Sequence, residues 1–497
     1  MVRFSQAARH LISGHPKVDR DAGPGAGPGR LNWPAGARII ACHAARIPLR
    51  DTADEETMTV PARRKFLAQC LAVSALPLSS AALPRDLEAL QMLRSRSEGY
   101  RLGQVHMLPA TPDTTQWGWF DNAQAPVLWL RSGDTVVMET MMASSDQIRP
   151  GVPIEEITRL RVDHPGRGPH TVTGPIWVDG AQPGDVLKVR INRIDLRPYG
   201  SNWNLPGELR LGQFPDEFPD GQVRHFYFDL RRMVTEFAPG VEIPLRPFPG
   251  IVGVARAEQG RYSTVPPGPF GGNLDIRELT EGSTIYLPVF VEGALLWSGD
   301  SHAAQGNGEI NLTAIETAFN ELSLTVEVIK GRPQNWPRIE TPTHWITVGY
   351  DRDLNKALDI LEEETVAFLV EQRGITAKQA AALMSSVADV RVAEVVNQLK
   401  GVYAMLPKRP RRSPRAPRPL RETQRAFVTS AADPSLQVAM DRAAREMVEL
   451  LHTRKGLSRL DAYALASLAM DTRVGEMSQD RKTVHCVLPK SLWVKDA

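Results

Sequence analysis

The stretch Pro183-Gly-Asp-Val-Leu-Lys-Val-Arg-Ile191 places a turn directly before a run of β-branched residues. Glycine supplies the turn, and valine and isoleucine suit a strand. Ser132-Gly-Asp-Thr-Val-Val-Met-Glu139 has the same order, and Glu281-Gly-Ser-Thr-Ile-Tyr-Leu-Pro-Val289 repeats it less closely. Between about residues 103 and 330, proline and glycine recur and no long segment has a helical period. This pattern predicts a sandwich- or barrel-like β core with long loops.

The tail of the chain contains an internal repeat. Residues 347–408 and 429–490 match at a constant offset of 82 residues without a gap. The matched pairs include Leu354 and Leu436, Ala357 and Ala439, Glu364 and Glu446, Gly374 and Gly456, Leu383 and Leu465, Asp389 and Asp471, Arg391 and Arg473, and Val402 and Val484. Two copies are too few for a solenoid, so we expect them to pack as a pseudo-symmetric pair.

Each copy of the repeat predicts two helices followed by a strand. The first helix ends at Gly374 or Gly456, and the second begins after Thr376 or Ser458. Glycine favours the end of a helix, and threonine and serine favour the position before its first turn. An alternating run such as Val402-Tyr-Ala-Met-Leu406 supplies the closing strand.

These patterns together predict an α+β fold. A β-rich catalytic domain at residues 83–340 is followed by repeated helix–helix–strand units at 341–408 and 426–497. The basic, proline-rich linker at 409–425 is expected to be extended and solvated. It has no interleaved aromatic residues, so we expect no nucleic-acid binding. The Asp-x-Arg present in both copies predicts a salt bridge rather than catalysis, because a single active site needs it only once.

Size and composition are those of a globular protein of two or three domains. The 497-residue chain has a formal charge of +2 and is 42% hydrophobic, so nothing in its global balance points to nucleic acid. Its three cysteines are Cys42, Cys70 and Cys486. We expect the first two to be absent from the mature protein, which leaves no disulfide. Cys486 is interpreted as a structural residue.

The first 82 residues differ from the rest. Residues 1–57 lack apolar periodicity and predict disorder or an over-extended start, with Met58 as the better start. Residues 58–82 carry Arg63-Arg64, a short apolar run and small residues in order, which is typical of a twin-arginine signal peptide. An amphipathic helix after a basic pair is the plain alternative. The signal predicts a periplasmic protein that starts near Leu83 and keeps no membrane anchor.

Metal-capable side chains gather just after the apolar run that ends at Val291. If residues 298–303 are extended, Asp300 and His302 face the same way. Gly306 and Gly308 could then fold the chain so that Glu309 lies beside them. One imidazole with two carboxylates suits a hard or borderline divalent ion. The alternative is an ordinary polar hairpin.

The same region carries a family resemblance. Several ordered motifs look like the acetamidase/formamidase family: 173–187, 247–250, 271–275, 279–283, 286–289, 293–295, 299–309 and 340–344, within roughly residues 100–408. The chain has Ser301 and Asn307 where the family usually has glycine and aspartate. The lost carboxylate weakens any catalytic role for position 307, but Asp300, His302 and Glu309 are kept.

The resemblance implies hydrolysis of a small amide, and the residue types suggest how. We expect Asp300, His302 and Asp275 to bind a divalent metal, with zinc the expected ion. His302 is also counted among the catalytic residues, and Glu309 is either a further ligand or the general base. Asn273 or a turn N–H could stabilise the oxyanion.

Three further residues are expected to contact the substrate: His164, His170 and Gln305. The two histidines lie in the rigid turn Asp163-His-Pro-Gly-Arg-Gly-Pro-His170. The alternative for them is a bond to nearby backbone. Gln305 lies in the 299–309 motif.

The leading hypothesis is therefore an amidohydrolase that releases ammonia and a carboxylate from a linear amide such as formamide or acetamide. There is no Gly-x-Ser-x-Gly elbow. Ser301 lies next to His302 and would point away from it along a strand. A non-catalytic periplasmic binding protein and a metal hydrolase of a cyclic amide or an ester stay open. A homo-oligomer follows from family analogy alone.

Overall fold

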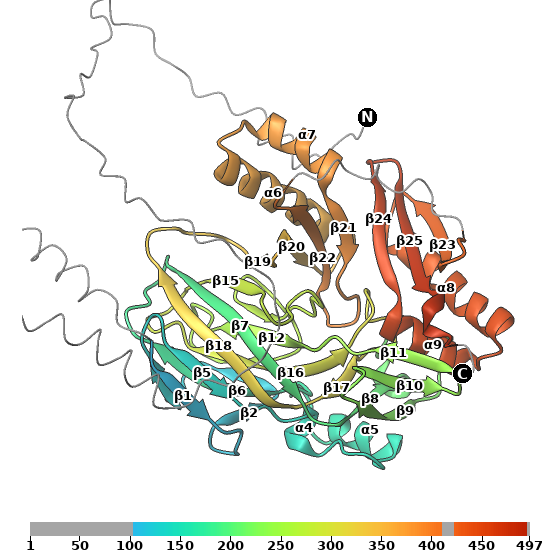
Figure 1. Cartoon of the computed structure of the whole chain (residues 1–497), viewed down its shortest axis with the longest axis horizontal. Coiled ribbons are helices and arrows are strands. Elements are labelled where there is room, and N and C mark those ends of the chain that lie inside the picture. The colour runs from blue at the N-terminus through green and yellow to red at the C-terminus, as the bar shows by residue number, and fades with distance from the viewer. Residues whose placement is uncertain (1–102, 410–421, 495–497) are drawn as a thin grey trace, which may run out of the picture. The chain divides into compact units, whose positions relative to one another are not determined.

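The computed structural model describes residues 103–409 and 422–494 (Figure 1). The predictions for residues 1–57 and 58–82, and for most of the linker, lie outside these ranges. Within them, two large sheets and the helices of the tail form a β-rich α+β structure, as the sequence predicts. No helix in the described part of the chain is both long and apolar enough to cross a bilayer.

The first sheet runs through the core and the tail without a break. In spatial order its strands are β1 (Val105–Leu108), β5 (Thr135–Met138), β18 (Phe319–Ile329), β7 (Val186–Leu196), β15 (Thr284–Pro288), β19 (Arg338–Glu340), β20 (His344–Asp351), β22 (Lys400–Pro407), β21 (Asp389–Val392), β24 (Asp471–Met477), β25 (Lys482–Pro489) and β23 (Ala426–Asp433). Because β19 pairs with β20, the first repeat continues the sheet of the core.

The three turn–strand stretches of the sequence all become strands of this sheet, where β7 pairs with β15 and β18 lies between β5 and β7. Gly133, Gly184 and Gly282 have positive φ angles of 97°, 89° and 81° at the turns before β5, β7 and β15. In the first two turns the aspartate that follows the glycine closes the turn. Asp134 accepts a hydrogen bond from the N–H of Arg131, and Asp185 accepts one from that of Gln182. The turn prediction is confirmed.

The second sheet carries the stretch that includes His302. Its strands in spatial order are β11 (Val241–Pro244), β10 (Val234–Ala238), β9 (Gln222–Asp229), β8 (Tyr199–Asn204), β17 (Ile315–Thr317), β16 (Leu296–Ala304), β12 (Phe248–Val254) and β14 (Gly271–Asn273). β6 (Thr171–Val178) also pairs with β16 and is flanked by β2 (Thr115–Trp117) and β4 (Leu128–Leu130). All nine residues of β16 are buried, so both of its faces are covered.

Short elements complete the core. β3 (Trp119–Asp121) and β13 (Arg261–Ser263) form a small separate sheet. The helices α4 (Ala143–Asp146) and α5 (Ile154–Val162) and the short 3-10 helix η2 (Gly207–Leu209) lie in the loops. Trp203 and Leu205 pack with Ile157 of α5 in a small apolar cluster apart from the main core.

The predicted helices and caps of the repeat are confirmed. They are α6 (Leu354–Arg373) and α7 (Ala377–Val387) in the first copy, and α8 (Leu436–Lys455) and α9 (Arg459–Ala469) in the second. Gly374 and Gly456 end the first helices with φ angles of 62° and 69°. The side chains of Thr376 and Ser458 accept N–H bonds at the starts of the second helices.

The prediction of one strand per repeat is incomplete. Each unit begins with a strand, β20 or β23, and ends with two, β21 and β22 or β24 and β25. The chain ends, in the described part, with the 3-10 helix η3 (Lys490–Leu492). β21 and β24 are short strands that open with the Asp-x-Arg of each repeat, and that motif was interpreted from the sequence as a salt bridge rather than as the start of a strand.

The two repeats meet as a pseudo-symmetric pair. β21 pairs antiparallel with β24, and Arg391 lies directly opposite its repeat equivalent Arg473. A local twofold axis therefore passes between these two positions. Figure 1 shows β21 and β24 side by side. Each arginine pairs with the aspartate two residues before it, Asp389 at 2.7 Å and Asp471 at 2.6 Å. The predicted salt bridge exists in both copies, at the start of the strand that follows the second helix of each repeat.

Gly349 offers a test of how closely the tail packs. A Cβ on this β20 residue would meet the carbonyl oxygen of Ala357 and lie 2.6 Å from the backbone nitrogen of Leu361 in α6. We expect Gly349→Ala to lower the free energy of unfolding by about 1–3 kcal/mol, because overpacking displaces the helix. Urea unfolding followed by circular dichroism measures this.

The second repeat supplies the control, since Ala431 occupies the equivalent position. Ala431→Gly is expected to cost only about 0.5–1 kcal/mol through backbone entropy. An unchanged unfolding midpoint for Gly349→Ala would contradict the close approach of β20 and α6.

Candidate active site

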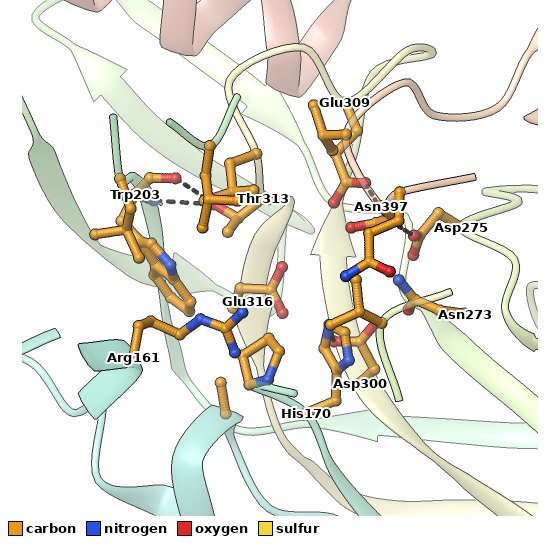
Figure 2. A pocket seen from close by; sticks show the side chains of 18 residues that line it. Arg161, His170, Trp203, Asn273, Asp275, Asp300, Glu309, Thr313, Glu316 and Asn397 are labelled. Carbon is orange, nitrogen blue, oxygen red and sulfur yellow. Dashed lines mark hydrogen bonds and ion pairs between the residues drawn. The ribbon is translucent and has the colours of Figure 1, made fainter. Parts of the chain in front are cut away.

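A pocket of about 650 Å³, including the part open to solvent, lies where the second sheet meets the first repeat (Figure 2). Its lining combines acidic and amide side chains with an apolar wall. The lining residues are Ala143, Arg161, Pro169, His170, Trp203, Leu205, Leu211, Val265, Asn273, Asp275, Asp300, Glu309, Leu312, Thr313, Glu316, Val396, Asn397 and Gln398. Such a pocket, with convergent polar groups in an apolar setting, is the usual form of a small-molecule site.

His302 lies buried beneath this pocket, on β16 opposite Phe248 of β12. Next along β12, Gly250 leaves room for the acidic cluster. A Cβ there would lie 2.5 Å from Asp300 Oδ2, 2.6 Å from His302 Cε1 and 2.7 Å from Asp275 Oδ1. The glycine of the Pro247-Phe-Pro-Gly250 motif is therefore required by close approach, not by its φ angle.

Three acidic residues of the site have left-handed backbone conformations. The φ angles of Asp275, Asp300 and Glu309 are 49°, 52° and 49°. For non-glycine residues this conformation costs of order 1–3 kcal/mol each and tends to occur at functional sites. Asp300 therefore does not sit in the regular extended strand that the sequence predicted. Its side chain still reaches His302, with Oδ2 3.3 Å from Nε2.

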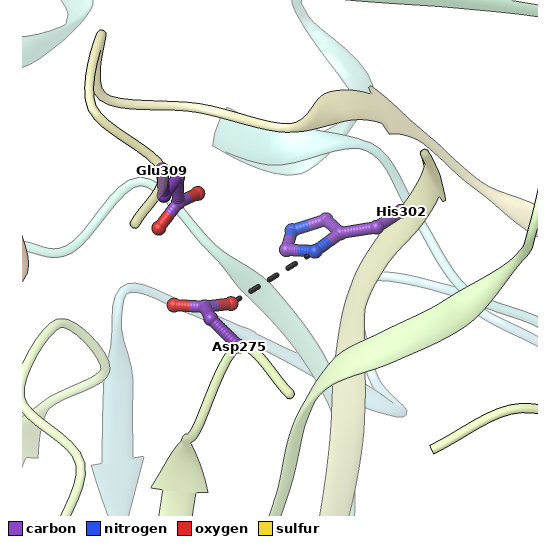
Figure 3. A group of neighbouring side chains, drawn as sticks. All are labelled: Asp275, His302 and Glu309. Carbon is purple, nitrogen blue, oxygen red and sulfur yellow. Dashed lines mark ion pairs between the residues drawn. The ribbon is translucent and has the colours of Figure 1, made fainter. Parts of the chain in front are cut away.

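Asp275, His302 and Glu309 face one another (Figure 3). One potential ligand atom from each lies within 4.8 Å of the others. His302 Nδ1 is 3.8 Å from Asp275 Oδ1, and neither atom has a hydrogen-bond partner among the described residues. The expectation that Glu309 folds back beside His302 is thus met.

The other nitrogen of the same ring faces a second acidic pair. His302 Nε2 lies 3.3 Å from Asp300 Oδ2 and 3.4 Å from Glu316 Oε1. Glu316 comes from β17, the strand paired with β16, and lies directly opposite His302. Sequence reasoning missed Glu316. Its nearest signal was a glutamate in the apolar run that follows the Gly-rich turn.

Burial and charge pairing shift the pKa values of this cluster in different directions. Burial raises the pKa of Asp275 well above its usual value, and burial together with Asp275 does the same for Glu309. Burial opposes ionisation of Asp300, but His170 and His302 outweigh it and lower its pKa to about 2.

The imidazole responds in the opposite sense. Burial alone would lower the pKa of His302, but the carboxylates of Glu316 and Asp300 outweigh it and raise that pKa well above its usual value. Burial also raises the pKa of Glu316. Without a bound cation, burial thus favours the protonated forms of Asp275 and Glu309, while the carboxylates of Asp300 and Glu316 favour the charged form of the His302 ring.

The turn that carries Glu309 is held between the two tail repeats. The N–H of Gly306 donates to the carbonyl oxygen of Ser467 in α9, at 2.8 Å. The N–H of Gly308 donates to that of Ala393 in the first repeat, at 2.9 Å. Gly308 has the positive φ angle expected of it, 96°, whereas Gly306 is needed because a Cβ would strike the second repeat.

Asn273 and His170 reach the pocket as predicted. Asn273, on β14, is buried, and its Oδ1 has no hydrogen-bond partner in the described part of the chain. His170 Nε2 is 3.8 Å from Asp300 Oδ1, and its Nδ1 is 3.1 Å from the hydroxyl of Thr264. Burial lowers the pKa of His170, so a neutral ring is favoured there.

The two other predicted substrate-binding residues lie outside the pocket lining. His164 Nδ1 is 3.2 Å from the carbonyl oxygen of Leu160, and its ring packs on Trp117 with centroids 4.7 Å apart. This is the backbone-bonded alternative that the sequence left open. Gln305 is buried and donates to the carbonyl oxygen of Asp275 at 3.3 Å. It therefore contacts the backbone of the acidic cluster but not the pocket.

Alternative nucleophiles find no support in the geometry. The hydroxyl of Ser301 is 2.7 Å from that of Thr140, and the hydroxyl of Ser298 donates to the carbonyl oxygen of Ile251. Cys486 is fully buried in β25, and burial raises the pKa of its thiol to about 12. Such a thiol stays protonated and inert.

A model of the Acetamidase/Formamidase family matches residues 111–260 and 255–409, more than half of the chain. The chain belongs to the acetamidase/formamidase family. The resemblance carried by the ordered motifs is thereby confirmed, and the matched region includes the Asp275, His302 and Glu309 cluster. The match ends before the second repeat begins.

Named relatives agree with this assignment. An acetamidase of Mycolicibacterium smegmatis is 30% identical over 221 residues, which cover 33% of this chain and 54% of the relative. The chain spans about half the length of the curated relatives that it matches. The crystal structure of an acetamidase from Bacillus halodurans is 31% identical, with a TM-score of 0.55, and the match covers 61% of this chain and 97% of that one.

A more distant structure shares the fold over a larger part of the chain. The gamma lactamase from Delftia acidovorans matches 79% of this chain and 94% of its own, with a TM-score of 0.55. Its identity of 20% supports a common fold and nothing further.

The two departures from the family motif do not disturb the pocket. The side-chain amide of Asn307 donates to the carbonyl oxygen of Val392 and to the hydroxyl of Tyr403. Neither Asn307 nor Ser301 lines the pocket. Asn307 therefore joins the site loop to the first repeat, and its missing carboxylate removes no group from the acidic cluster.

Gly250 provides a test of this geometry. Gly250→Ala would push a methyl group among Asp275, Asp300 and His302, so we expect binding of a divalent cation to weaken at least about 10-fold. Isothermal titration with Zn²⁺ measures the effect. Gly260→Ala is the control, because its φ angle is not left-handed and a Cβ there would come no nearer than 3.3 Å to its closest neighbour, the Tyr262 ring. Equal Zn²⁺ affinity in wild type and Gly250→Ala would show that the cluster does not bind the cation.

Proposed function

We propose that this protein hydrolyses the C–N bond of a small linear amide and releases ammonia and a carboxylate. The observation that carries the proposal is the convergence of Asp275, His302 and Glu309 in the pocket of an acetamidase/formamidase family member. Relatives from Mycolicibacterium smegmatis and Methylophilus methylotrophus are named acetamidase and formamidase. These names support the class of bond for this chain rather than a particular amide.

The cluster fits a divalent metal ion. Asp275 Oδ1 and His302 Nδ1 are buried, face each other and lack hydrogen-bond partners among the described residues, which is costly unless something else binds them. Glu309 adds a second carboxylate on the same side. We propose that these three residues hold the ion, and a mixed nitrogen and oxygen donor set suits zinc. When bound, such an ion polarises a carbonyl group and acidifies water.

Asp300 and Glu316 have a different role in this proposal. Both lie on the Nε2 side of His302, within 3.4 Å. An N–H on Nε2 that donates to these carboxylates fixes the tautomer and leaves Nδ1 free to bind a cation. Asp300 was predicted from the sequence to be a metal ligand. In this proposal it instead accepts a hydrogen bond from the His302 ring.

The remaining steps use groups that line the pocket. Glu309 has two alternative roles here: as a ligand it holds the ion, and as the general base it takes a proton from the attacking water and returns it to the nitrogen as the C–N bond breaks. The amide of Asn273 can donate to the carbonyl oxygen as negative charge develops there. The wall formed by Trp203, Leu205 and Leu312 limits access of bulk water.

The first experiment measures ammonia release from formamide and acetamide by the purified chain, before and after chelation, beside His302→Ala. We expect the wild type to lose activity on chelation and to regain it with a divalent ion, and His302→Ala to be inactive throughout. Activity that survives chelation would exclude a requirement for the metal in hydrolysis. No ammonia from either linear amide, while Zn²⁺ still binds, would favour a binding protein or a different bond.

A second experiment separates the two sides of the His302 ring. We expect Asp275→Ala to abolish measurable Zn²⁺ binding, because it removes a ligand. Glu316→Ala should weaken Zn²⁺ binding about 10–100-fold, the usual effect of losing a group behind a ligand. Titration calorimetry of both variants shows which substitution weakens Zn²⁺ binding more. The reverse order would place the ion on the Nε2 side, with Asp300 and Glu316.

A further inference from the structure

The loop between β21 and β22 of the first repeat enters the pocket. Val396, Asn397 and Gln398 line it, although no residue of the tail was predicted to belong to the site. The loop is tied to the Glu309 turn through Gly308, whose carbonyl oxygen accepts the N–H of Val395 at 3.1 Å. The loop and the acidic cluster are therefore joined through the backbone.

Asn397 contacts two of the three proposed ligands at once. Its Nδ2 donates to Asp275 Oδ2 at 2.7 Å and to Glu309 Oε2 at 3.2 Å. Figure 2 shows its side chain beside both carboxylates. Asn397 is only 7% exposed. Two buried carboxylates repel each other, and one neutral amide group with two N–H bonds can hold both without adding charge.

The backbone around Asn397 is itself fixed. The carboxylate of Glu394, which is fully buried, accepts the N–H groups of Val396 at 2.8 Å and Asn397 at 2.9 Å. Gln398 follows with a positive φ angle of 67°. These hydrogen bonds fix the backbone of the loop and, with it, the direction of the Asn397 side chain.

The second repeat shows what this segment looks like without a pocket. There β24 extends to Met477 and β25 begins at Lys482, so the connection is a short hairpin. The equivalents of Glu394 and Asn397 are Glu476 and Gln479, and both are exposed. The two copies match in their helices, caps and Asp-x-Arg but differ at this loop. A residue used by one active site is expected in one copy only.

We propose that Asn397 is a positioning residue, which holds Asp275 and Glu309 so that their remaining oxygen atoms face His302 and a bound cation. The first tail repeat then completes the active site. The catalytic part of this inference rests on the proposed amidase function, whereas the cation-binding part does not.

The test compares Asn397→Ala and Asn397→Leu with the wild type in Zn²⁺ titration and in ammonia release. The leucine keeps most of the side-chain volume and removes the donors, so it separates the lost hydrogen bonds from a cavity. We expect both variants to bind Zn²⁺ about 10–100-fold more weakly. We also expect kcat to fall by a larger factor than KM changes. Gln479→Ala, at the equivalent position of the second repeat, should match the wild type in both assays.

Several outcomes decide the inference. Wild-type Zn²⁺ affinity and kcat in both variants would overturn it. If Asn397→Ala does not fold, the leucine variant decides by the same criterion. If the wild type binds Zn²⁺ but hydrolyses no amide, the proposed function fails while Zn²⁺ affinity still decides the role of Asn397. A loss of affinity in Gln479→Ala as large as that in the Asn397 variants would show a general effect of the tail and would also overturn the inference.

Discussion

His302 lies buried with Asp275 on one side of its ring and Asp300 and Glu316 on the other, and this charge pairing constrains the structure around it. Buried acids are tolerated only when they are paired or bind a cation. The arrangement also requires left-handed backbone at three acidic residues and a glycine at position 250. β16 is wholly buried, and the turn that carries Glu309 is hydrogen-bonded to both repeats. These contacts hold the strained positions in place.

Much of the fold follows from local signals. The Gly-Asp turns fix the starts of β5 and β7, because glycine takes the positive φ angle and aspartate closes the turn. Thr376 and Ser458 begin helices where capping chemistry predicts them. His302 and Glu309 could be singled out because one short Gly-rich stretch carries both. Each of these features depends on residues close together in the sequence.

Other features depend on contacts between distant segments and had no local signal. Glu316 becomes part of the site only because β17 pairs with β16 in one particular register. Asn397 lies about 90 residues after Glu309 in the sequence, in a repeat that suggested a purely structural role. His164 shows the opposite error, because a histidine in a rigid turn near a predicted site lies outside the pocket and packs on Trp117. Proximity in sequence does not place a side chain in a pocket.

The local twofold axis between Arg391 and Arg473 has an evolutionary consequence. Without the second repeat, β21 would be an open sheet edge, and such an edge pairs readily with an identical edge of another molecule. Duplication followed by fusion converts a contact between two subunits into a contact within one chain. Once two copies of a unit are covalently joined, each is free to specialise. Here the first repeat carries a loop that reaches the pocket, and the second repeat covers the edge of β21.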